Sequence, residues 1–505
     1  MTKKKIKEPQ EIHIDYVASG FAASFRLSSP YEDYEKEIAA HLAKSSEFLK
    51  HSLGDTVKIS GLFNAYTEET FAERVTESGQ EFRALFPDGM YADSGGLQVV
   101  TQGKTIDANQ RKKIYAVQAK YADYAMSFDE IPAEMKTVVD PITKEIKKYR
   151  VNFEDLDKIE RYGKKAGENL KEQIAYFDSI NSKCKIFPIV QGQDFAKMSA
   201  YTIGMLSQLD DHEMDKLECL AVGGVNNEFE LLERARNIYN MDIPYKLKGH
   251  FHALGVTGFR KLLPILLGAK NGLLPGLKKI SFDSTTFTKS YLLGSVQPSL
   301  QDYLSGKAKQ KSLGKVRNKF IENYYQEMFD WWKDNPDNIF DDAEDLLQHS
   351  MFHGQYNNPN KPDLPLDQRF TTGAQQYKNL SLMDGVKTIV QKHVYIYYNT
   401  YKFITILEAY LHGEVAMEKF MDGYKQLDYL KWLENITDPN DLDDFFKNVY
   451  KSVKMVGKTE ANGEGVVDFM FDAQEIVPDN TKQQKKEKKK TIVEIDAVKA
   501  TNSLF

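Results

Sequence analysis

Short apolar runs that end in a polar residue or in glycine recur along the first 300 residues, and each is followed by a longer amphipathic segment. The six clearest runs occupy residues 90–93, 124–129, 184–191, 219–224, 250–255 and 279–283. Residues 186–190 are continuously apolar, which is typical of a parallel strand buried on both faces. Residues 228–239 interleave apolar and charged positions at the period of a helix. The pattern predicts a series of strand–helix units.

The spacing of these units indicates how they assemble. Their polar ends follow one another at intervals of 28 to 36 residues, apart from one interval of 62 residues between Asp129 and Gln191. One βα unit takes roughly 30 residues, and six consecutive units fit a doubly wound sheet or an α/β barrel. We favour an α/β fold of the (β/α)8 TIM type with insertions, because polar residues stand at the C-terminal end of every strand. An open sheet concentrates them at one switch point.

The rest of the chain is predicted to complete the barrel and to add an α-rich C-terminal region. Residues 1–300 hold most of the barrel, including the first strands and a helix over residues 31–53. Residues 301–383 form an insertion with a helix over 320–333, and residues 384–424 form long barrel-closing helices. Residues 425–505 are a C-terminal extension. A cluster of tyrosines at helical spacing is expected in the core: Tyr395, Tyr397, Tyr398 and Tyr401.

Composition limits the class of protein. The 505 residues are 41% hydrophobic and 12% aromatic, which excludes a disordered or fibrous chain. Cys184 and Cys219 are the only cysteines, so neither a disulfide scaffold nor a Cys-rich zinc module is possible. No apolar run is long enough to span a bilayer, and residues 1–10 lack the apolar stretch of a signal peptide. We expect a soluble, cytoplasmic protein with no membrane partner.

The charge of the chain is unevenly distributed. The net charge is −6, but residues 482–490 contain six lysines and one glutamate. This basic tail either contacts nucleic-acid phosphates or is a solvated, disordered segment. An acidic total does not exclude a nucleic-acid partner, because the local distribution of charge decides binding.

Three of the polar strand ends are aspartates, namely Asp93, Asp129 and Asp283. A single aspartate at such a position usually caps the next helix. Three of them around one barrel mouth repel one another, which favours a functional role for the set. Gln191 and the glycines Gly223 and Gly224 add an amide and bare backbone, and this combination matches the hydrogen-bonding edge of a purine. Paired carboxylates also suit displacement at the anomeric carbon of a sugar.

In order and spacing, these residues resemble the queuine and archaeosine tRNA-guanine transglycosylases, over about residues 88–424. Six short motifs in register are more specific than any one of them. The matching segments are Asp93-Ser94-Gly95-Gly96-Leu97-Gln98-Val99, Phe128-Asp129-Glu130, Ile189-Val190-Gln191-Gly192, Leu220-Ala221-Val222-Gly223-Gly224, Leu254-Gly255-Val256, Phe282-Asp283 and residues 393–403.

The resemblance implies a pentosyltransferase without a cofactor and assigns a role to each matching residue. Asp283 is the nucleophile that attacks C1′ of a flipped-out guanosine, and Asp93 is the general acid/base. Asp129 and Gln191 hold the guanine or 7-deazaguanine edge. The remaining implied substrate contacts are Ser94, Gly95, Gly223, Gly224, Val225, Leu254 and Lys289.

The chain departs from the family pattern at several positions. Family members bind a structural zinc through three cysteines and one histidine after the nucleophile strand, and residues 301–383 replace that segment here without any cysteine. His349 and His353 stand four residues apart, which we interpret as a solvated helix face rather than a metal site. Leu97 replaces a base-stacking aromatic residue, so Leu254 supplies the apolar face. Lys289 replaces an arginine as the phosphate contact.

These departures bear on the substrate. A divergent branch of the family, found in phages and bacterial genomic islands, inserts 7-deazaguanine derivatives into DNA, and the missing cysteines with an unrelated extension favour this branch. We therefore expect nucleic acid as the partner, DNA before tRNA, a free base such as 7-cyano-7-deazaguanine, and a homodimer. The host cytoplasm is the expected location if the protein is viral. A non-catalytic binding subunit and a base-removing hydrolase stay as alternatives.

Overall fold

The fold is described from a computed structural model of the chain. The residues that the structure describes are 12–19, 35–53, 57–66, 86, 88–95, 106–139, 146–223, 229–256, 259–284, 291, 294–306, 311–313, 318–350, 382–415 and 427–450.

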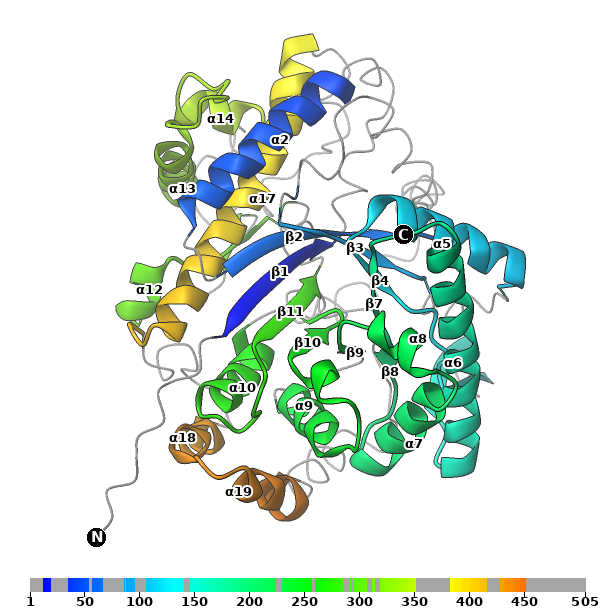
Figure 1. Cartoon of the computed structure of the whole chain (residues 1–505). Coiled ribbons are helices and arrows are strands. Elements are labelled where there is room, and N and C mark those ends of the chain that lie inside the picture. The colour runs from blue at the N-terminus through cyan, green and yellow to red at the C-terminus, as the bar shows by residue number, and fades with distance from the viewer. Residues whose placement is uncertain are drawn as a thin grey trace.

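Parallel strands form a closed barrel at the centre of the molecule (Figure 1). Pro188 divides one strand into two pieces, because proline has no N–H to give to the ladder. One piece pairs with β4 and the other with β9, and β11 pairs with β1, so the ring closes with eight strand positions. The strands are β1 (His13–Ser19), β2 (Val57–Asn64), β3 (Met90–Asp93), β4 (Tyr124–Met126), β7 (Lys185–Phe187) with β8 (Ile189–Val190), β9 (Leu220–Val222), β10 (His250–Ala253) and β11 (Lys279–Ser284). The predicted TIM-type barrel is confirmed.

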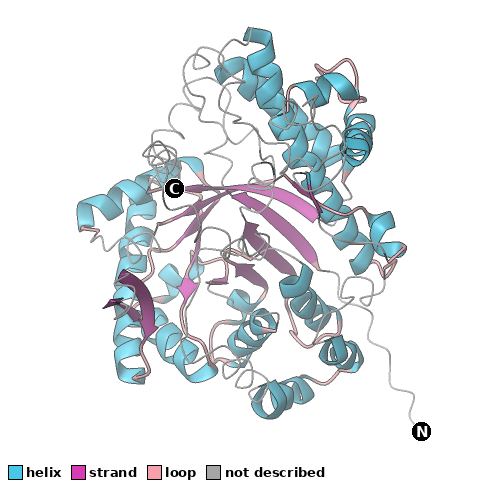
Figure 2. Cartoon of the chain, turned by 180° about the vertical axis from the view of Figure 1, so that it is seen from behind, coloured by secondary structure: helices cyan, strands magenta, loops and turns pink. Residues whose placement is uncertain are grey.

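Helices surround the barrel on its outside (Figure 2). They are α2 (Glu35–Ser52), α5 (Ala108–Tyr121), α6 (Leu156–Ser179), α7 (Phe195–Leu206), α8 (Asp211–Asp215), α9 (Glu230–Asn240), the 3-10 helix η3 (Tyr245–Lys248) and α10 (Phe259–Lys270). The long interval before Gln191 holds an added antiparallel hairpin, β5 (Ala133–Val139) and β6 (Ile146–Asn152), in addition to α6.

Alternation along the strands divides the core into two layers. On β1, Ile14 and Tyr16 face outward and belong to the large cluster between barrel and helices, whereas Val17 faces the barrel interior. The interior cluster consists of Val17, Tyr91, Met126, Phe187, Ile189, Cys219 and Ala221. The barrel is therefore filled with side chains, and a ligand has room only at its ends.

A buried ionic network lies within the barrel toward the N-terminal ends of the strands. Asp15 is 1% exposed, and its carboxylate accepts hydrogen bonds from Ser60 Oγ at 2.7 Å and from Tyr91 OH at 2.8 Å. Lys279 Nζ lies 3.1 Å from the same carboxylate. A buried charge of this kind is tolerated only when it is paired and hydrogen-bonded. The network joins β1, β2, β3 and β11 and leaves the opposite end of the barrel for chemistry.

The region after β11 is mainly helical and packs on the barrel beside α2 (Figure 1). It contains β12 (Ser295–Val296), α12 (Leu300–Leu304), β13 (Lys311–Ser312), α13 (Asn318–Trp332), α14 (Ala343–Gln348) and α17 (Leu382–Leu411). Helix α13 confirms the helix predicted over 320–333. Helix α17 ends well before residue 424, and Gly413 stands just beyond it with φ +76°. The tyrosine cluster lies in the core as predicted, with Tyr395, Tyr397 and Tyr398 buried and Tyr401 partly buried.

The first part of the C-terminal extension packs against the barrel's outer helices. It forms α18 (Leu427–Asn435), α19 (Pro439–Asp444) and the π-helix η7 (Phe445–Tyr450). Arg236 of α9 pairs with both carboxylate oxygens of Asp443 at 2.8 and 2.9 Å, and Asn271 Nδ2 donates to the Leu433 carbonyl at 2.8 Å. The basic tail at 482–490 lies outside the described residues. Within the described ranges, no helix is both long and apolar enough to cross a membrane.

Candidate active site

The structure brings the three strand-end aspartates together at the C-terminal mouth of the barrel. Asp93 is the last residue of β3, Asp129 lies three residues beyond β4, and Asp283 lies in β11. Asp129 and Asp283 are each 7% exposed. Burial is the main reason that the pKa values of Asp93 and Asp129 are raised, and the charge of Asp283 adds to the rise at Asp93 and the charge of Asp93 to the rise at Asp129. The three aspartates therefore lie at one end of the barrel, as the sequence predicted.

Asp93 is held so that its carboxyl group can exchange a proton near neutral pH. Burial, with the nearby charge of Asp283, raises its pKa to about 6, although the backbone N–H groups of Gly95 and Ser94 oppose the rise. Asn64 is its register partner on β2, and Asn64 Nδ2 donates to Asp93 Oδ2 at 3.1 Å. The Asn64 amide is itself oriented, because its oxygen accepts the N–H of Tyr66 at 3.0 Å.

Asp129 and Gln191 form a second polar pair at the same mouth. Gln191 Nε2 donates to Asp129 Oδ2 at 2.6 Å and joins the ends of the fourth and fifth strand positions. Burial raises the pKa of Asp129 to about 7, and the hydrogen bond from Gln191 opposes this rise. The pair presents a carboxyl group beside a primary amide, a combination that suits the polar edge of a base.

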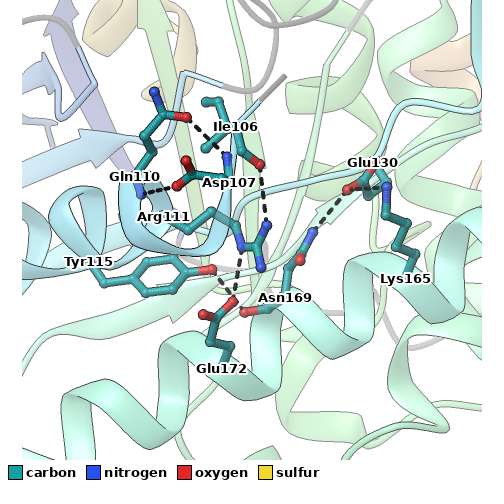
Figure 3. Close-up of polar contacts among 9 residues, drawn as sticks. All are labelled: Ile106, Asp107, Gln110, Arg111, Tyr115, Glu130, Lys165, Asn169 and Glu172. Atoms are coloured by element: carbon teal, nitrogen blue, oxygen red, sulfur yellow. Dashed lines mark hydrogen bonds and ion pairs between the residues drawn. The ribbon is translucent and has the colours of Figure 1, made fainter. Parts of the chain in front are cut away.

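Glu130, the residue after Asp129, contacts helix α6 (Figure 3). Glu130 Oε1 lies 3.0 Å from Lys165 Nζ and 3.2 Å from Asn169 Nδ2, both on α6. Arg111 of α5 and Glu172 of α6, at 2.9 Å, extend the same contact between the two helices. Glu130 therefore serves the structure of the loop and leaves Asp129 facing the mouth.

Asp283 is supported through a single carboxylate oxygen. The backbone N–H of Gly255 donates to Asp283 Oδ1 at 2.9 Å, and His252 Nε2 lies 3.5 Å from the same atom. Gly255 adopts φ +66°, a left-handed conformation that aims its N–H at the carboxylate and that glycine adopts without strain. Among the described residues, the second oxygen, Oδ2, has no hydrogen-bond or ion-pair partner.

The turn residues contribute in different ways. Ser94 is fully buried and donates its hydroxyl to the Ser127 carbonyl at 3.0 Å, so this side chain fastens the loop after β4, and its substrate contact stays a prediction. Gly95 has φ +78°, and a Cβ there would lie 2.7 Å from Tyr66 Cβ. Gly223 and Leu254 lie side by side, since a Cβ on Gly223 would meet Leu254 Cβ at 3.4 Å.

Gly223 is also tied to the helix that follows it. Arg234 Nη1 donates to the Gly223 carbonyl at 2.5 Å, and Arg234 Nη2 lies 2.5 Å from Glu230 Oε1. Both side chains of this ion pair are almost fully buried. The pair fixes where the loop leaves β9. The expected contacts Gly224, Val225 and Lys289, together with Leu97, lie outside the described residues.

Two supporting residues were missed from the sequence. Asn64 ends the strand Val57–Asn64 as a polar residue, which is the same signal that marks the aspartates, but this strand was not among the six runs. His252 alternates with apolar residues along β10, and only the barrel geometry places it beneath Asp283.

His349 does not lie on a solvated helix face. It follows the end of α14, its side chain is 12% exposed, and its Nδ1 lies 3.1 Å from Asp345 Oδ1. His353 lies outside the described residues. In the described part of the chain, no three His, Cys, Asp or Glu side chains gather as a metal site requires.

Comparisons with known proteins add little about activity. No family model and no curated protein matches the chain. Two crystal structures of the homocysteine methyltransferase MmuM from Escherichia coli, in apo and oxidised forms, match with 9% and 7% identity and TM-scores of 0.29 and 0.31. The alignments cover 55% of this chain and 91% and 92% of the MmuM chains. A likeness of this extent carries no inference about a substrate.

Proposed function

We propose that the protein is a guanine transglycosylase that exchanges guanine in nucleic acid, with DNA favoured, for a 7-deazaguanine base through a covalent glycosyl-aspartate. The observation that carries the proposal is the convergence of Asp93, Asp129 and Asp283 at one barrel mouth, in the order that resembles the transglycosylase family. Two of these carboxyl groups have raised pKa values, and the third has one oxygen held and one free.

In the first half of the exchange, Asp283 Oδ2 attacks C1′ of the target nucleotide. The C1′–N9 bond breaks, and its electron pair passes to the departing guanine. The carboxylic acid of Asp93 supplies the proton that neutralises this base, a role that its pKa of about 6 allows. The product is a sugar esterified to Asp283, with Asp93 left as a carboxylate.

In the second half, the incoming base replaces guanine. The Asp93 carboxylate removes the N9 proton, N9 attacks C1′, and the ester bond to Asp283 breaks, so both aspartates return to their starting states. Two displacements at one carbon retain the configuration of the sugar. The exchange conserves the number of glycosidic bonds and needs no energy source.

Recognition of the base falls to residues on the strands β4, β8, β9 and β10 and just beyond their ends. The Asp129–Gln191 pair offers acceptor and donor atoms to a guanine-like edge, and Leu254, which lies beside Gly223, offers an apolar contact. A nucleotide reaches this depth only after it has left its base stack, so the substrate has to be single-stranded or flipped out.

The proposal is tested with labelled guanine and separate DNA and tRNA substrates. We expect the full chain to incorporate label into DNA, Asp283→Ala to incorporate none, and Asp211→Asn, at an exposed position on α8, to act as the unmodified protein does. A sugar ester on the Asp283 peptide, found by mass spectrometry after an acid quench, is the second expected result.

Other outcomes identify the alternatives. Incorporation into tRNA alone overturns the choice of DNA. Abasic sites that form despite excess free base indicate a hydrolase. Binding of nucleic acid that is unaffected by Asp283→Ala, with neither exchange nor ester, indicates a non-catalytic subunit.

A further inference from the structure

Beneath Asp283, a chain of polar side chains runs down the interior of the barrel. His252 Nδ1 lies 2.7 Å from Ser281 Oγ, and Ser281 Oγ lies 2.6 Å from His250 Nε2. All three are buried, with exposures of 0% for His252 and Ser281 and 6% for His250. His252 and Ser281 are register partners on β10 and β11, so the barrel itself places them together.

The orientation of the His252 ring is fixed by its neighbours. It stacks on Tyr91 with the ring centroids 5.5 Å apart and 19° between the planes, and Phe187 packs on it at 5.6 Å. With Nδ1 held toward Ser281, Nε2 is left facing Asp283 Oδ1 at 3.5 Å, the outer limit of hydrogen-bonding distance. This nitrogen is buried and has no hydrogen-bond partner at shorter range.

Because a serine hydroxyl has a single proton, the hydrogen bonds from His250 through Ser281 to His252 can all run in only one direction at a time. Ser281 can donate to one histidine only, and it must accept from the other. Burial, aided by the charge of Lys279, holds the pKa of His250 well below its usual value, so this ring is neutral and carries one N–H. If His250 Nε2 carries that proton, Ser281 donates to His252 Nδ1, and the proton of His252 is then on Nε2, facing Asp283.

The opposite arrangement is unfavourable next to an ionised nucleophile. With Nδ1 of His252 protonated, its Nε2 lone pair faces the carboxylate across 3.5 Å in a buried environment, where repulsion is poorly screened. With Nε2 protonated, the same contact becomes a charge-assisted hydrogen bond. The charge on Asp283 therefore selects one direction of the chain.

We propose that His252 is a positioning residue for Asp283, kept as the Nε2–H tautomer by the Ser281–His250 pair. Together with the Gly255 N–H, it engages Oδ1 and so directs Oδ2 to attack. The inference rests on the proposed function for its catalytic meaning, but the tautomer of His252 is a property of the protein alone.

The test measures that tautomer in the full chain labelled with 15N-histidine, by long-range proton–nitrogen correlation NMR. The His252 signals are identified by their loss in His252→Gln. We expect a protonated Nε2 and a bare Nδ1 in the unmodified protein, and a shift toward protonated Nδ1 in Asp283→Ala and toward a mixture in Ser281→Ala. Protonated Nδ1 in the unmodified protein overturns the inference.

A kinetic measurement extends the test to the reaction. Ser281→Ala keeps the imidazole ring and its packing, so it avoids the larger cavity that loss of His252 leaves. We expect it to lower kcat about 10-fold with little change in KM, since only the alignment of the nucleophile is lost. If the unmodified protein exchanges bases and Ser281→Ala has the same kcat, the inference is also overturned. Failure of the proposed function is distinct, because the protein then shows no base exchange whatever the tautomer of His252.

Discussion

Asn64 and Asp93 face each other at the ends of β2 and β3, with Asn64 Nδ2 donating to Asp93 Oδ2 at 3.1 Å. A hydrogen bond donated to a carboxylate favours its charged form. Burial of Asp93 favours the neutral form and raises its pKa, and the backbone N–H groups of Gly95 and Ser94 oppose that rise. We therefore expect Asn64, on the neighbouring strand, to contribute to the pKa of Asp93, the proposed general acid/base.

Asn64→Asp tests this balance with a minimal change in shape. The new carboxylate keeps an acceptor for the Tyr66 N–H but puts a like charge beside Asp93, which raises the pKa of Asp93 above about 6. We expect the alkaline limb of the kcat/KM profile to move upward by about one pH unit. Asn435→Asp, in α18 away from the site, is the matched control, and an identical profile for both variants contradicts the prediction.

Gln191→Met probes base recognition. Methionine keeps the length of the side chain but removes the donor that lies 2.6 Å from Asp129, so the pKa of Asp129 rises above about 7 and a contact to the base is lost. We expect KM for the free base to rise about 10-fold, a typical result of losing one hydrogen bond, while kcat changes less. Gln326→Met, at an exposed position on α13, serves as the control. An effect on kcat alone speaks against a role in binding.

The pH dependence of stability follows from the raised pKa of Asp129, which burial lifts from 3.8 to about 7. Between these values the folded protein binds more protons than the unfolded chain, so this group contributes stability below pH 4 that is lost as the pH rises through 7. Asp129→Asn removes this loss. We expect the variant to be more stable than the unmodified protein at pH 8 by on the order of 4 kcal/mol.

Thermal unfolding at pH 4.0, 6.0 and 8.0, chosen to bracket the shift, measures this effect. The difference in Tm between Asp129→Asn and the unmodified protein is expected to grow with pH, while exposed Asp211→Asn gives no such trend. A constant difference across the three pH values means that the Asp129 carboxyl is not shifted as described.

The buried Arg234–Glu230 pair supports the loop that begins at Gly223. Arg234→Met removes the cation that pairs with the buried Glu230 carboxylate, so we expect a loss of about 3–5 kcal/mol in the free energy of unfolding. The double variant Glu230→Leu/Arg234→Met removes both charges of the pair and is expected to recover most of the loss caused by Arg234→Met. Urea unfolding of the three proteins checks the prediction, and equal destabilisation by the single and double variants contradicts it.

The sequence by itself determined the class of fold and the positions of the strand-end carboxylates. Continuous apolar runs such as residues 186–190 mark buried parallel strands, and regular spacing of their polar ends indicates a barrel, because each βα unit returns the chain to the same end. Asp93, Asp129, Gln191 and Asp283 were all identified this way. Of the helical region predicted over residues 384–424, α17 ends at Leu411, and residues 416–424 lie outside the described residues.

Only the tertiary structure decided which side chains support the site and which serve the fold. Asn64, His252 and Ser281 come from strands that are neighbours in the barrel, and their contacts depend on the register between strands, which hydrophobic pattern does not encode residue by residue. Ser94 and Glu130 stand in the same motifs as Asp93 and Asp129, yet Ser94 contacts the loop after β4 and Glu130 contacts helix α6. Burial, a property of the packed barrel, gives Asp93 and Asp129 their raised pKa values.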